Sequence, residues 1–452
     1  MTAPSRSNIA PRAKTGFGSF HLLVVKQLGL AVPHTPVPSV FFRPARMHAN
    51  YARLVELSHA AHLRGRSLLG LDPRDIALAR LYSYSFRAHT IGVFHATASA
   101  LPSEGDTPPA ALPLRTLALQ SLAELASQTM DPIPRDGRAL VSTFHLYHQR
   151  LTRVETTLDL WRSLYPQPKL NQAASWFSKH IDTIRQGSGL HTMSDLAPLE
   201  QASFTVPNLG ITICPLVYGD FHSWNLAWLP EPASGVPCHQ HAQGVEIHLG
   251  YGPLHGATIL GDAEAEVREG YAMPIPPGTR HGYVNRGPLP HHVPFVFGSF
   301  HTGGWGVFLD VEPQPPAPEQ LTPVAVTSRA MRGTILLERE LERAAQRLAA
   351  VRYQLIPARV TDRHGTGGLE LSVARVTPRG TDWRHDEFAA VSVVRGRGEL
   401  VLAGETRPLA PHDHFGLPGG LTAHIRQTGT DPLVLLDVIL KPGESSGRFG
   451  LT

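Results

Sequence analysis

The chain has 452 residues, of which 42% are hydrophobic and 17% charged, and its formal net charge is +4. This apolar content can bury a core, which excludes a chain disordered throughout, and the length predicts two to four domains of about 100–200 residues. No apolar stretch approaches the ~18 residues of a membrane span, so we expect a soluble protein without a membrane partner. The two cysteines, Cys214 and Cys238, cannot form a disulfide framework, which favours a cytoplasmic location.

The distribution of charge argues against a nucleic-acid partner, because most arginines are scattered singly rather than gathered in runs. The one skewed region is the N-terminus, where the first acidic residue is Glu56. An apolar run at 20–25 is short for a targeting segment and is broken by Lys26. We therefore expect residues 1–46 to form a basic, partly disordered arm.

Residues 47–200 are predicted to form a helical domain, because apolar residues recur there at three- and four-residue spacing. Loops rich in proline and glycine, at 101–112 and 131–137, separate the periodic segments. The helices are expected at 53–61, 75–88, 114–128, 139–164 and 172–186.

From about residue 204, short β-rich runs alternate with Gly, Pro and Asn turns, a pattern typical of a sandwich or barrel. We expect one β domain at 204–315 and a second at 353–445. The connection at 316–352 continues a proline-rich, extended linker that begins at 311, and it contains an amphipathic helix at 334–351. That helix should pack across the barrels of its own chain, with the helical domain capping one end. Two β modules around one connector indicate an internal duplication.

The chemistry of the chain is concentrated between residues 235 and 285. His239 and His241 are two apart, so on a strand they point to the same face. Glu246 begins the next β run, and His281 follows a Pro-Pro-Gly turn. Three imidazoles and a carboxylate inside a small barrel predict a site for a divalent first-row transition metal, whereas magnesium and calcium prefer oxygen ligands.

These residues resemble the two signature motifs of the cupin superfamily. The second motif matches at every position: Gly270, Pro276, Gly278, His281 and Asn285. The first motif matches at its two histidines and its glutamate, while its glycines are displaced to Gly235 and Gly252. The resemblance covers about residues 205–315. It implies a jelly-roll barrel in which the metal ligands are His239, His241, Glu246 and His281.

The second β block is similar to a cupin only in part. His424 follows Pro418 and Gly420 with one residue more than the motif has, and His385 occupies the His-x-His place. Ala389 stands where the glutamate would fall, so we expect this degenerate barrel to hold no metal and to serve packing or dimerisation, which allows a homodimer. The predicted fold class is a multidomain α+β protein, with an N-terminal helical domain followed by two cupin-type (jelly-roll) barrels: a bicupin with one metal site.

Strand alternation adds candidates near the metal. His248 should share the inward face of Glu246, and Tyr283 that of His281. Either could position substrate or move a proton, and the alternative for each is a buried wall residue. His301 and Trp305 are further candidates, at the barrel mouth. In the helical domain, the pairs Glu56/His59 and His145/His148 are interpreted as ordinary histidines of helix faces, because a di-iron bundle needs more carboxylates.

The cupin fold hosts many reactions, so three classes of function remain. The first is a non-haem Fe(II) dioxygenase, an oxidoreductase in which four protein ligands leave room for a small organic substrate and O₂. The second is an isomerase or epimerase of a sugar or hydroxy-carbonyl compound, and the third is a non-enzymatic small-molecule-binding bicupin. Aromatic residues near the site (Tyr251, Tyr271, Tyr283, Phe295, Phe297) suit an organic substrate, so the dioxygenase ranks first. Fe(II) is the favoured metal, with Mn(II), Ni(II) or Zn(II) possible, and Glu246, His248 and Tyr283 are the candidate catalytic residues.

Overall fold

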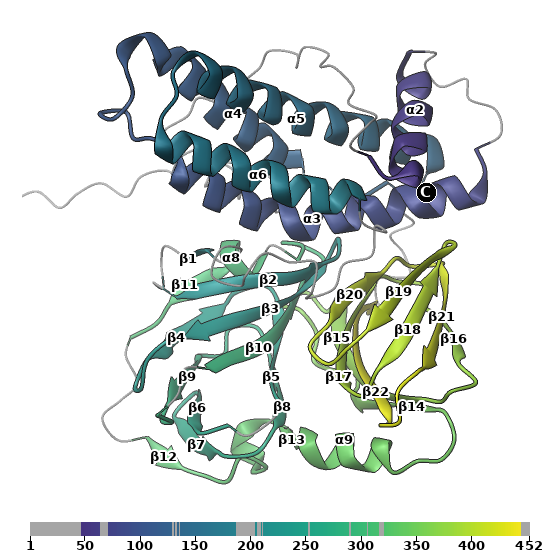
Figure 1. Cartoon of the computed structure of the whole chain (residues 1–452). Helices are drawn as coiled ribbons and strands as arrows, with labels where there is room; N and C mark the ends of the chain where they lie inside the picture. Colours follow the sequence, from purple (N-terminus) through teal and green to yellow (C-terminus); the bar gives the residue numbers. More distant parts are fainter. Residues whose placement is uncertain are drawn as a thin grey trace, which may run out of the picture.

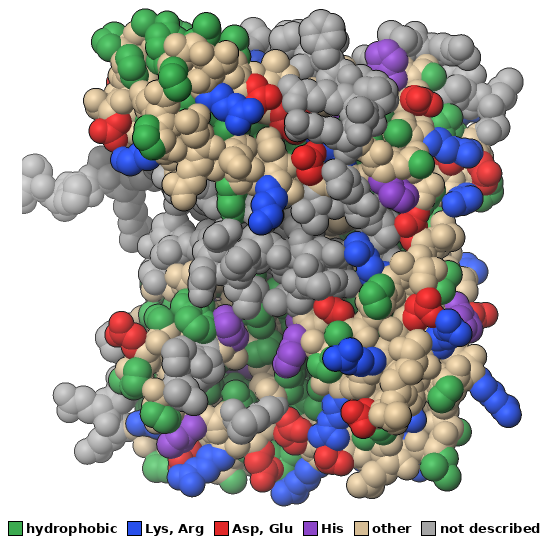
Figure 2. Space-filling view, in the orientation of Figure 1, with side chains coloured by type: hydrophobic (Ala, Val, Ile, Leu, Met, Phe, Trp, Pro, Cys, Tyr) green, Lys and Arg blue, Asp and Glu red, His purple; other side chains and the backbone are tan. Residues whose placement is uncertain are grey.

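The computed structural model places a layer of helices over two β regions that lie side by side (Figure 1). It describes residues 47–63, 71–128, 131, 133–134, 136–186, 204–205, 209, 211–251, 254–288, 291–304, 306–315 and 321–443. The expected N-terminal arm at 1–46 lies outside these residues. On the face shown in Figure 2, acidic and basic side chains are interspersed, as their scatter along the sequence predicts.

The helices expected from apolar spacing are confirmed, and all five begin earlier than predicted. They are α2 (Ala49–Leu63), α3 (Pro73–Ala100), α4 (Leu112–Gln128), α5 (Gly137–Leu164) and α6 (Pro168–Gln186). Two of the early starts have a local cause: Asp72 accepts a hydrogen bond from the Arg74 backbone N–H, and Asp136 accepts one from that of Ala139. Such caps satisfy the free N–H groups of a first helical turn. None of the helices in the described part of the chain is long and apolar enough to cross a membrane.

The first β region is a sandwich of two antiparallel sheets. In one sheet the strands follow the order β1-β2-β3-β10-β5-β8-β13, and in the other the order β11-β4-β9-β6-β7-β12. The strands of the first sheet are β1 (Phe204–Thr205), β2 (Thr212–Tyr218), β3 (His222–Leu229), β10 (His291–Gly298), β5 (Val245–Gly250), β8 (Tyr271–Ile275) and β13 (Ile335–Leu336). Those of the second are β11 (Val311–Pro313), β4 (Gly235–His241), β9 (His281–Asn285), β6 (Gly256–Leu260), β7 (Ala263–Val267) and β12 (Thr322–Pro323).

The second β region repeats the central part of this arrangement. Its sheets have the orders β14-β15-β22-β17-β20 and β16-β21-β18-β19, which correspond strand by strand to β2-β3-β10-β5-β8 and β4-β9-β6-β7. The strands are β14 (Val351–Ile356), β15 (Gly367–Val376), β22 (Leu433–Pro442), β17 (Ala389–Arg395), β20 (His414–Leu417), β16 (Thr381–Arg384), β21 (Thr422–Gln427), β18 (Gly398–Leu402) and β19 (Glu405–Leu409). The internal duplication inferred from the sequence is therefore confirmed at the level of topology.

The connection between the β regions differs from its prediction. The helix expected over 334–351 is only α9 (Leu337–Ala345), because the residues before it pair with β8 as β13 and Val351 begins the edge strand β14. Pairing with a neighbouring strand has overridden helix propensity at both ends. The expected linker is also partly built into the first sandwich, since β11 pairs with β4 and β12 with β7.

Helix α9 packs across both β regions, as predicted. It contacts β8 of the first and β15 and β22 of the second. Its apolar side is fully buried at Leu337, Leu341 and Ala344, and Arg395 of β17 forms an ion pair with Glu342 at 2.8 Å. The helix thus fixes the two barrels to each other.

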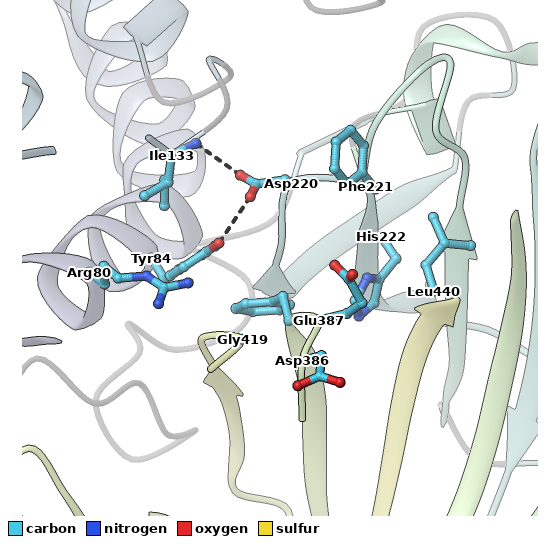
Figure 3. A pocket seen from close by; sticks show the side chains of 11 residues that line it. Arg80, Tyr84, Ile133, Asp220, Phe221, His222, Asp386, Glu387, Gly419 and Leu440 are labelled. Carbon is cyan, nitrogen blue, oxygen red and sulfur yellow. Dashed lines mark hydrogen bonds between the residues drawn. The ribbon is translucent and has the colours of Figure 1, made fainter. Parts of the chain in front are cut away.

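The helical layer is joined to the barrels through Asp220, in the turn between β2 and β3. Its carboxylate accepts hydrogen bonds from the hydroxyl of Tyr84 at 3.0 Å and the backbone N–H of Ile133 at 3.0 Å (Figure 3), and from the buried Arg87 at 2.7 Å. The ring of Phe388 of the second region packs against that of Tyr84 in a tilted arrangement, with ring centroids 4.4 Å apart. A cavity of about 170 Å³ remains where the three parts meet.

The buried His222 gives this junction a measurable dependence on pH. Its Nε2 lies 3.1 Å from the carbonyl oxygen of Val438, and burial lowers its pKa to about 4. An unfolded histidine has a pKa near 6.5, so the unfolded state binds a proton that the folded state excludes, and stability falls as the pH drops below about 6.5. We expect His222 to account for about 2 kcal/mol of stability lost between about pH 7 and pH 5.

Denaturant unfolding of His222→Gln at both pH values checks this expectation. Glutamine can still donate to the Val438 carbonyl but does not titrate, so the variant should lose less stability on acidification than the parent chain. His255→Gln is the matched control, because that side chain is 49% exposed. An equal pH response of the parent chain and His222→Gln would show that His222 is protonated as readily in the fold as outside it.

Candidate metal centre

Strands from both sheets of the first sandwich bring the four predicted ligands together. His239 and His241 lie on β4, and His281 begins the adjacent strand β9, where it pairs directly with His239. Glu246 lies on β5 in the opposing sheet. The exposed fractions of these residues are 4%, 3%, 0% and 2%, respectively. Alternation along β4 and the pairing of β4 with β9 therefore direct three imidazoles toward one carboxylate, as the sequence predicts.

The potential ligand atoms of His239, His241, Glu246 and His281 all lie within 4.8 Å of one another. From Oε2 of Glu246, Nε2 of His241 is 2.8 Å away and Nε2 of His281 is 3.3 Å away. The rings of His239 and His281 approach to 4.1 Å between centroids. Four donor atoms at this spacing can bind one common ion.

Backbone carbonyl groups orient two of the imidazoles. The Nδ1 atom of His239 lies 2.9 Å from the carbonyl oxygen of Pro237, and that of His281 lies 2.8 Å from the carbonyl oxygen of Thr279. A proton on Nδ1 that donates to the carbonyl leaves the Nε2 lone pair free for a metal, an arrangement common among histidine ligands.

The second motif builds the turn that delivers His281. Gly278 has a φ of 68°, a conformation that favours glycine, and its N–H donates to the carbonyl of His241 at 2.7 Å. At the other end of β9, the side chain of Asn285 accepts from the Gly287 N–H and donates to the carbonyl of Glu231. These contacts explain why the motif requires Gly and Asn at these positions.

The electrostatics suit a metal cation. Burial, reinforced by the neighbouring His281 and His241, holds the pKa of His239 well below its ordinary value. Burial opposes ionisation of Glu246, but His281, His248 and His241 outweigh it and hold the pKa of this carboxyl well below its ordinary value. A neutral imidazole and an ionised carboxylate are the forms that bind metals.

Two buried atoms of the centre are suited to bind a metal ion. Oε2 of Glu246 and Nε2 of His281 have no hydrogen bond of ordinary geometry among the described residues, although a buried polar atom without a partner is costly. A divalent ion would satisfy both atoms. Three imidazole nitrogens and one carboxylate oxygen fit a first-row transition metal, and the set by itself does not select one of them.

A small, largely apolar cavity adjoins the centre. Its volume is about 20 Å³, enough for roughly one water molecule. The described residues that line it, besides His239, His241 and Glu246, are His248 and nine apolar residues: Leu209, Ile211, Ile213, Ala227, Val236, Val293, Phe295, Val307 and Val311. No Lys, Arg, Asn or Gln side chain is among these described lining residues.

The further candidates around the first centre have different fates. His248 faces inward as alternation predicts, lines the cavity, and places Nε2 2.9 Å from Oε1 of Glu246. Tyr283 is fully buried, and burial raises its pKa to about 12, but it is not among the cavity-lining residues. Of the aromatic residues expected around the site, Phe295 lines the cavity, whereas Tyr251 lies beside Ser392 of the second β region.

The placement of His301 at the barrel mouth is wrong. Its side chain is exposed and lies against a loop of the second region, with its ring 4.2 Å from that of His364. The turn before α8 (Gly306–Leu309) carries it away from the cavity. Trp305 lies outside the described residues.

In the second sandwich, the described residues contain no metal-ligand cluster of the kind found in the first. His424 points outward, with a side chain 43% exposed and paired with Asp382 at 2.9 Å, while its neighbours Ala423 and Ile425 are buried. The extra residue in the second motif explains this, because a shift of one residue moves a side chain to the other face of a strand. The absence of a metal from this barrel stays a prediction.

Sequence reasoning missed a charged network inside the second sandwich, formed by Arg352, Glu370, Asp437 and Lys441 with His385. The available signal was an acidic residue inside an otherwise apolar strand, as at Asp437 in β22. The interpretation of the helical-domain histidines as ordinary polar-face residues is wrong for two of them, because His145 and His148 are only 2% and 4% exposed. The rings of His59 and His145 lie 5.3 Å apart, and His148 lies 3.4 Å from the Tyr51 hydroxyl.

Comparisons with known proteins find similarity in fold and none in sequence families. No family model and no curated protein matches the chain. Solved structures show similarity at low sequence identity. The architecture is N-terminal helices followed by two β sandwiches.

Two of these structures are salicylate 1,2-dioxygenase of Pseudaminobacter salicylatoxidans and a mutant of that enzyme in complex with gentisate. Each is 15% identical to this chain with a TM-score of 0.39. The first match covers 50% of this chain and 76% of that one, and the second covers 56% and 82%. Oxalate decarboxylase of Bacillus subtilis is 12% identical with a TM-score of 0.36, over 52% of this chain and 75% of that one.

Proposed function

We propose that the chain is a metal-dependent enzyme, a non-haem Fe(II) oxygenase acting on a small organic substrate in the first sandwich. The observation that carries the proposal is the buried set of His239, His241, Glu246 and His281 beside a small, largely apolar cavity. When bound there, Fe(II) would supply the one-electron chemistry that O₂ requires.

The residues of the chain have separable tasks in this proposal. The three histidines and Glu246 hold the ion, and the single negative charge of Glu246 offsets part of its charge. His248 hydrogen-bonds Oε1 of Glu246 at 2.9 Å, which fixes the carboxylate. It is also the remaining titratable side chain in the described lining, so it is the group placed to accept or deliver a substrate proton.

The cavity wall limits the substrate. Beyond the groups that face the metal, the described lining offers aliphatic side chains and Phe295. A carboxylate or phosphate on the distal part of a substrate would lose its hydration without gaining a partner there, which is strongly unfavourable. We therefore propose a compact substrate whose polar atoms are confined to the end that faces the metal. Because the cavity of about 20 Å³ holds roughly one water molecule, the apolar wall must move outward when this substrate binds.

An isomerase of a hydroxy-carbonyl compound is the second candidate, and the position of His248 favours it. Such a reaction requires a proton carrier within reach of the substrate, with the metal acting as a Lewis acid in place of redox chemistry, and His248 lines the cavity 2.9 Å from Oε1 of Glu246. The cavity and the ligands do not distinguish the two functions, because both use the same set.

Metal loading and gas chemistry separate these candidates. The chain, loaded anaerobically with Fe(II), should bind nitric oxide as an O₂ analogue and give a high-spin iron–nitrosyl signal in electron paramagnetic resonance. It should then consume O₂ with members of a panel of small neutral ketones, enediols and phenols. An Fe(II)-loaded chain that binds no nitric oxide contradicts the oxygenase, and conversion of a hydroxy-carbonyl substrate by the Zn(II) form without O₂ supports the isomerase.

A further inference from the structure

The turn between two of the metal ligands bridges the opposing sheets of the first sandwich. Residues 242–244, here called the ligand turn, connect His241 at the end of β4 to β5, in which Glu246 is the second residue. Nε2 of His241 and Oε2 of Glu246 lie 2.8 Å apart. The course of the ligand turn therefore sets how this imidazole faces this carboxylate.

A single buried carboxylate binds every backbone N–H of the ligand turn. Oδ2 of Asp310 accepts hydrogen bonds from the N–H groups of Gln243 and Gly244 at 2.7 and 2.8 Å. Oδ1 accepts from the N–H of Ala242 at 3.1 Å. Asp310 is 7% exposed, so the three bonds are shielded from water. An ionised carboxylate can accept all three, because both of its oxygens are acceptors and neither is a donor.

Asp310 also connects the ligand turn to the cavity wall. It lies between α8, which carries Val307, and β11, which begins with Val311, and both valines line the cavity beside the metal centre. Val311 pairs with His241 across β11 and β4. Because Asp310 precedes this pair by one residue, its carboxylate lies just beyond the end of β4, where the ligand turn begins.

The second sandwich holds the same turn through its central residue, Gln243. The backbone N–H of Arg363, in the loop between β14 and β15, donates to the carbonyl of Gln243 at 2.9 Å. Nε2 of His364 lies 2.9 Å from Oε1 of the same glutamine. The buried Asp362 braces this loop, since its Oδ1 accepts from the Thr366 N–H at 2.8 Å.

His241 depends on its turn more than the other two histidine ligands do. Backbone carbonyl groups lie 2.9 and 2.8 Å from Nδ1 of His239 and His281, whereas Nδ1 of His241 has no such partner within the described part of the chain. Its ring packs against Phe297 with centroids 4.8 Å apart, and a side chain at Gly244 would overlap that same phenylalanine. A displaced ligand turn would therefore disturb the orientation of His241.

We propose that Asp310 is a positioning residue of the metal centre, which holds the ligand turn so that His241 and Glu246 can bind one ion. His364 supports the same turn from the second sandwich, which thus contributes to the centre without supplying a ligand. This inference rests on the metal ion of the proposed function and does not depend on the reaction at that ion.

The test measures Co(II) binding to the full chain. Competition with a chromophoric chelator gives the affinity, and the visible absorption of bound Co(II) reports the number and geometry of its ligands. Asp310→Asn replaces one acceptor oxygen with an NH₂ group that cannot accept from the turn. It should weaken Co(II) binding by about 10-fold, the lower end of the loss for residues that support metal ligands, and it should alter the absorption spectrum.

His364→Ala is the second variant, and its exposed position makes unfolding improbable on physical grounds. It removes one hydrogen bond to the ligand turn, so Co(II) binding should weaken by about 2- to 5-fold. Its matched control is His424→Ala, another exposed histidine of the second sandwich, which pairs with Asp382 and should leave Co(II) binding unchanged.

Asp413→Asn is the matched control for Asp310→Asn. Asp413 is 6% exposed and accepts from the Ala410 N–H at 2.8 Å in a turn of the second sandwich. Its loss should lower the midpoint of denaturant unfolding, while the affinity and the spectrum of Co(II) stay those of the parent chain. The comparison separates positioning of the ligands from a general loss of stability.

Three outcomes would overturn the proposal. The first is a folded Asp310→Asn chain with the affinity and spectrum of the parent, and the second is an equal loss of affinity in Asp413→Asn. The third decides the matter if Asp310→Asn does not fold: His364→Ala that binds Co(II) as tightly as His424→Ala. A parent chain that binds no Co(II) would instead refute the proposed metal centre, and this inference with it.

Discussion

Metal analysis of the purified chain is expected to find about one transition-metal ion per chain, and His281→Ala should lose it almost completely. His281 is fully buried between His239 and Glu246, so alanine removes a ligand and leaves a space that no described side chain fills. Loss of a supporting residue beyond the ligands commonly costs 10- to 100-fold in affinity, and loss of a ligand should exceed about 100-fold. Competition with a chromophoric chelator measures the change.

His424→Ala is the matched control for this experiment. His424 has the corresponding motif position in the second sandwich, but it points to solvent and contacts Asp382. Its loss should leave both the stoichiometry and the affinity unchanged. Two tightly bound ions per chain, or a full ion in the double variant His239→Ala/His281→Ala, would refute a single centre in the first sandwich.

The ligands could be predicted from sequence because local rules place them. Two-residue spacing sets His239 and His241 on one face of β4, and a glycine-containing turn returns the chain to that strand at His281. The same alternation correctly turned His248 inward. Alternation also accounts for the outward position of His424. The second motif has one extra residue before His424, which places its side chain on the opposite face of the strand, so this position could have been predicted by counting residues in the sequence.

The features that escaped prediction depend on contacts between distant segments. Nothing near Asp220 in the sequence indicates that Tyr84, Arg87 and the backbone of Ile133 converge on it. The length of α9 was overestimated because strand pairing at Ile335 and Val351 competes with a good helical sequence. For Tyr283, alternation could not tell how far along β9 the cavity extends.

The charged interior of the second sandwich also depends on contacts between distant segments, so the sequence does not predict it. Glu370 and Asp437 are separated by 67 positions, and each is a lone acid in an apolar strand. From the sequence alone, a single acidic residue in an apolar segment suggests an exposed edge strand. Only the register of β15 with β22 shows that both carboxylates lie on one face of the sheet. The duplication is visible in the strand order, while the chemistry of the two copies has diverged side chain by side chain.

The exchange of Glu246 and His248 for glutamine, one at a time, is the sharpest test of the proposed chemistry. In Glu246→Gln the amide oxygen can still coordinate, though without charge, so metal affinity should fall less than in His281→Ala. Turnover should fall far more than metal content, because the negative charge is gone and the contact between His248 and Oε1 at 2.9 Å is altered. A lost acid–base group typically costs about 10²- to 10⁴-fold in rate.

In His248→Gln the amide N–H can still donate to Glu246, so the carboxylate keeps its orientation while the proton carrier is removed. An oxygenase in which Glu246 matters most predicts the larger loss of turnover in Glu246→Gln. An isomerase that moves a proton through His248 predicts the larger loss in His248→Gln. Metal content and turnover of both variants, measured with the substrate found in the O₂-uptake or isomerase assay, decide between them. Full activity in both would exclude each mechanism, because turnover would then require neither the charge of Glu246 nor a proton carried by His248.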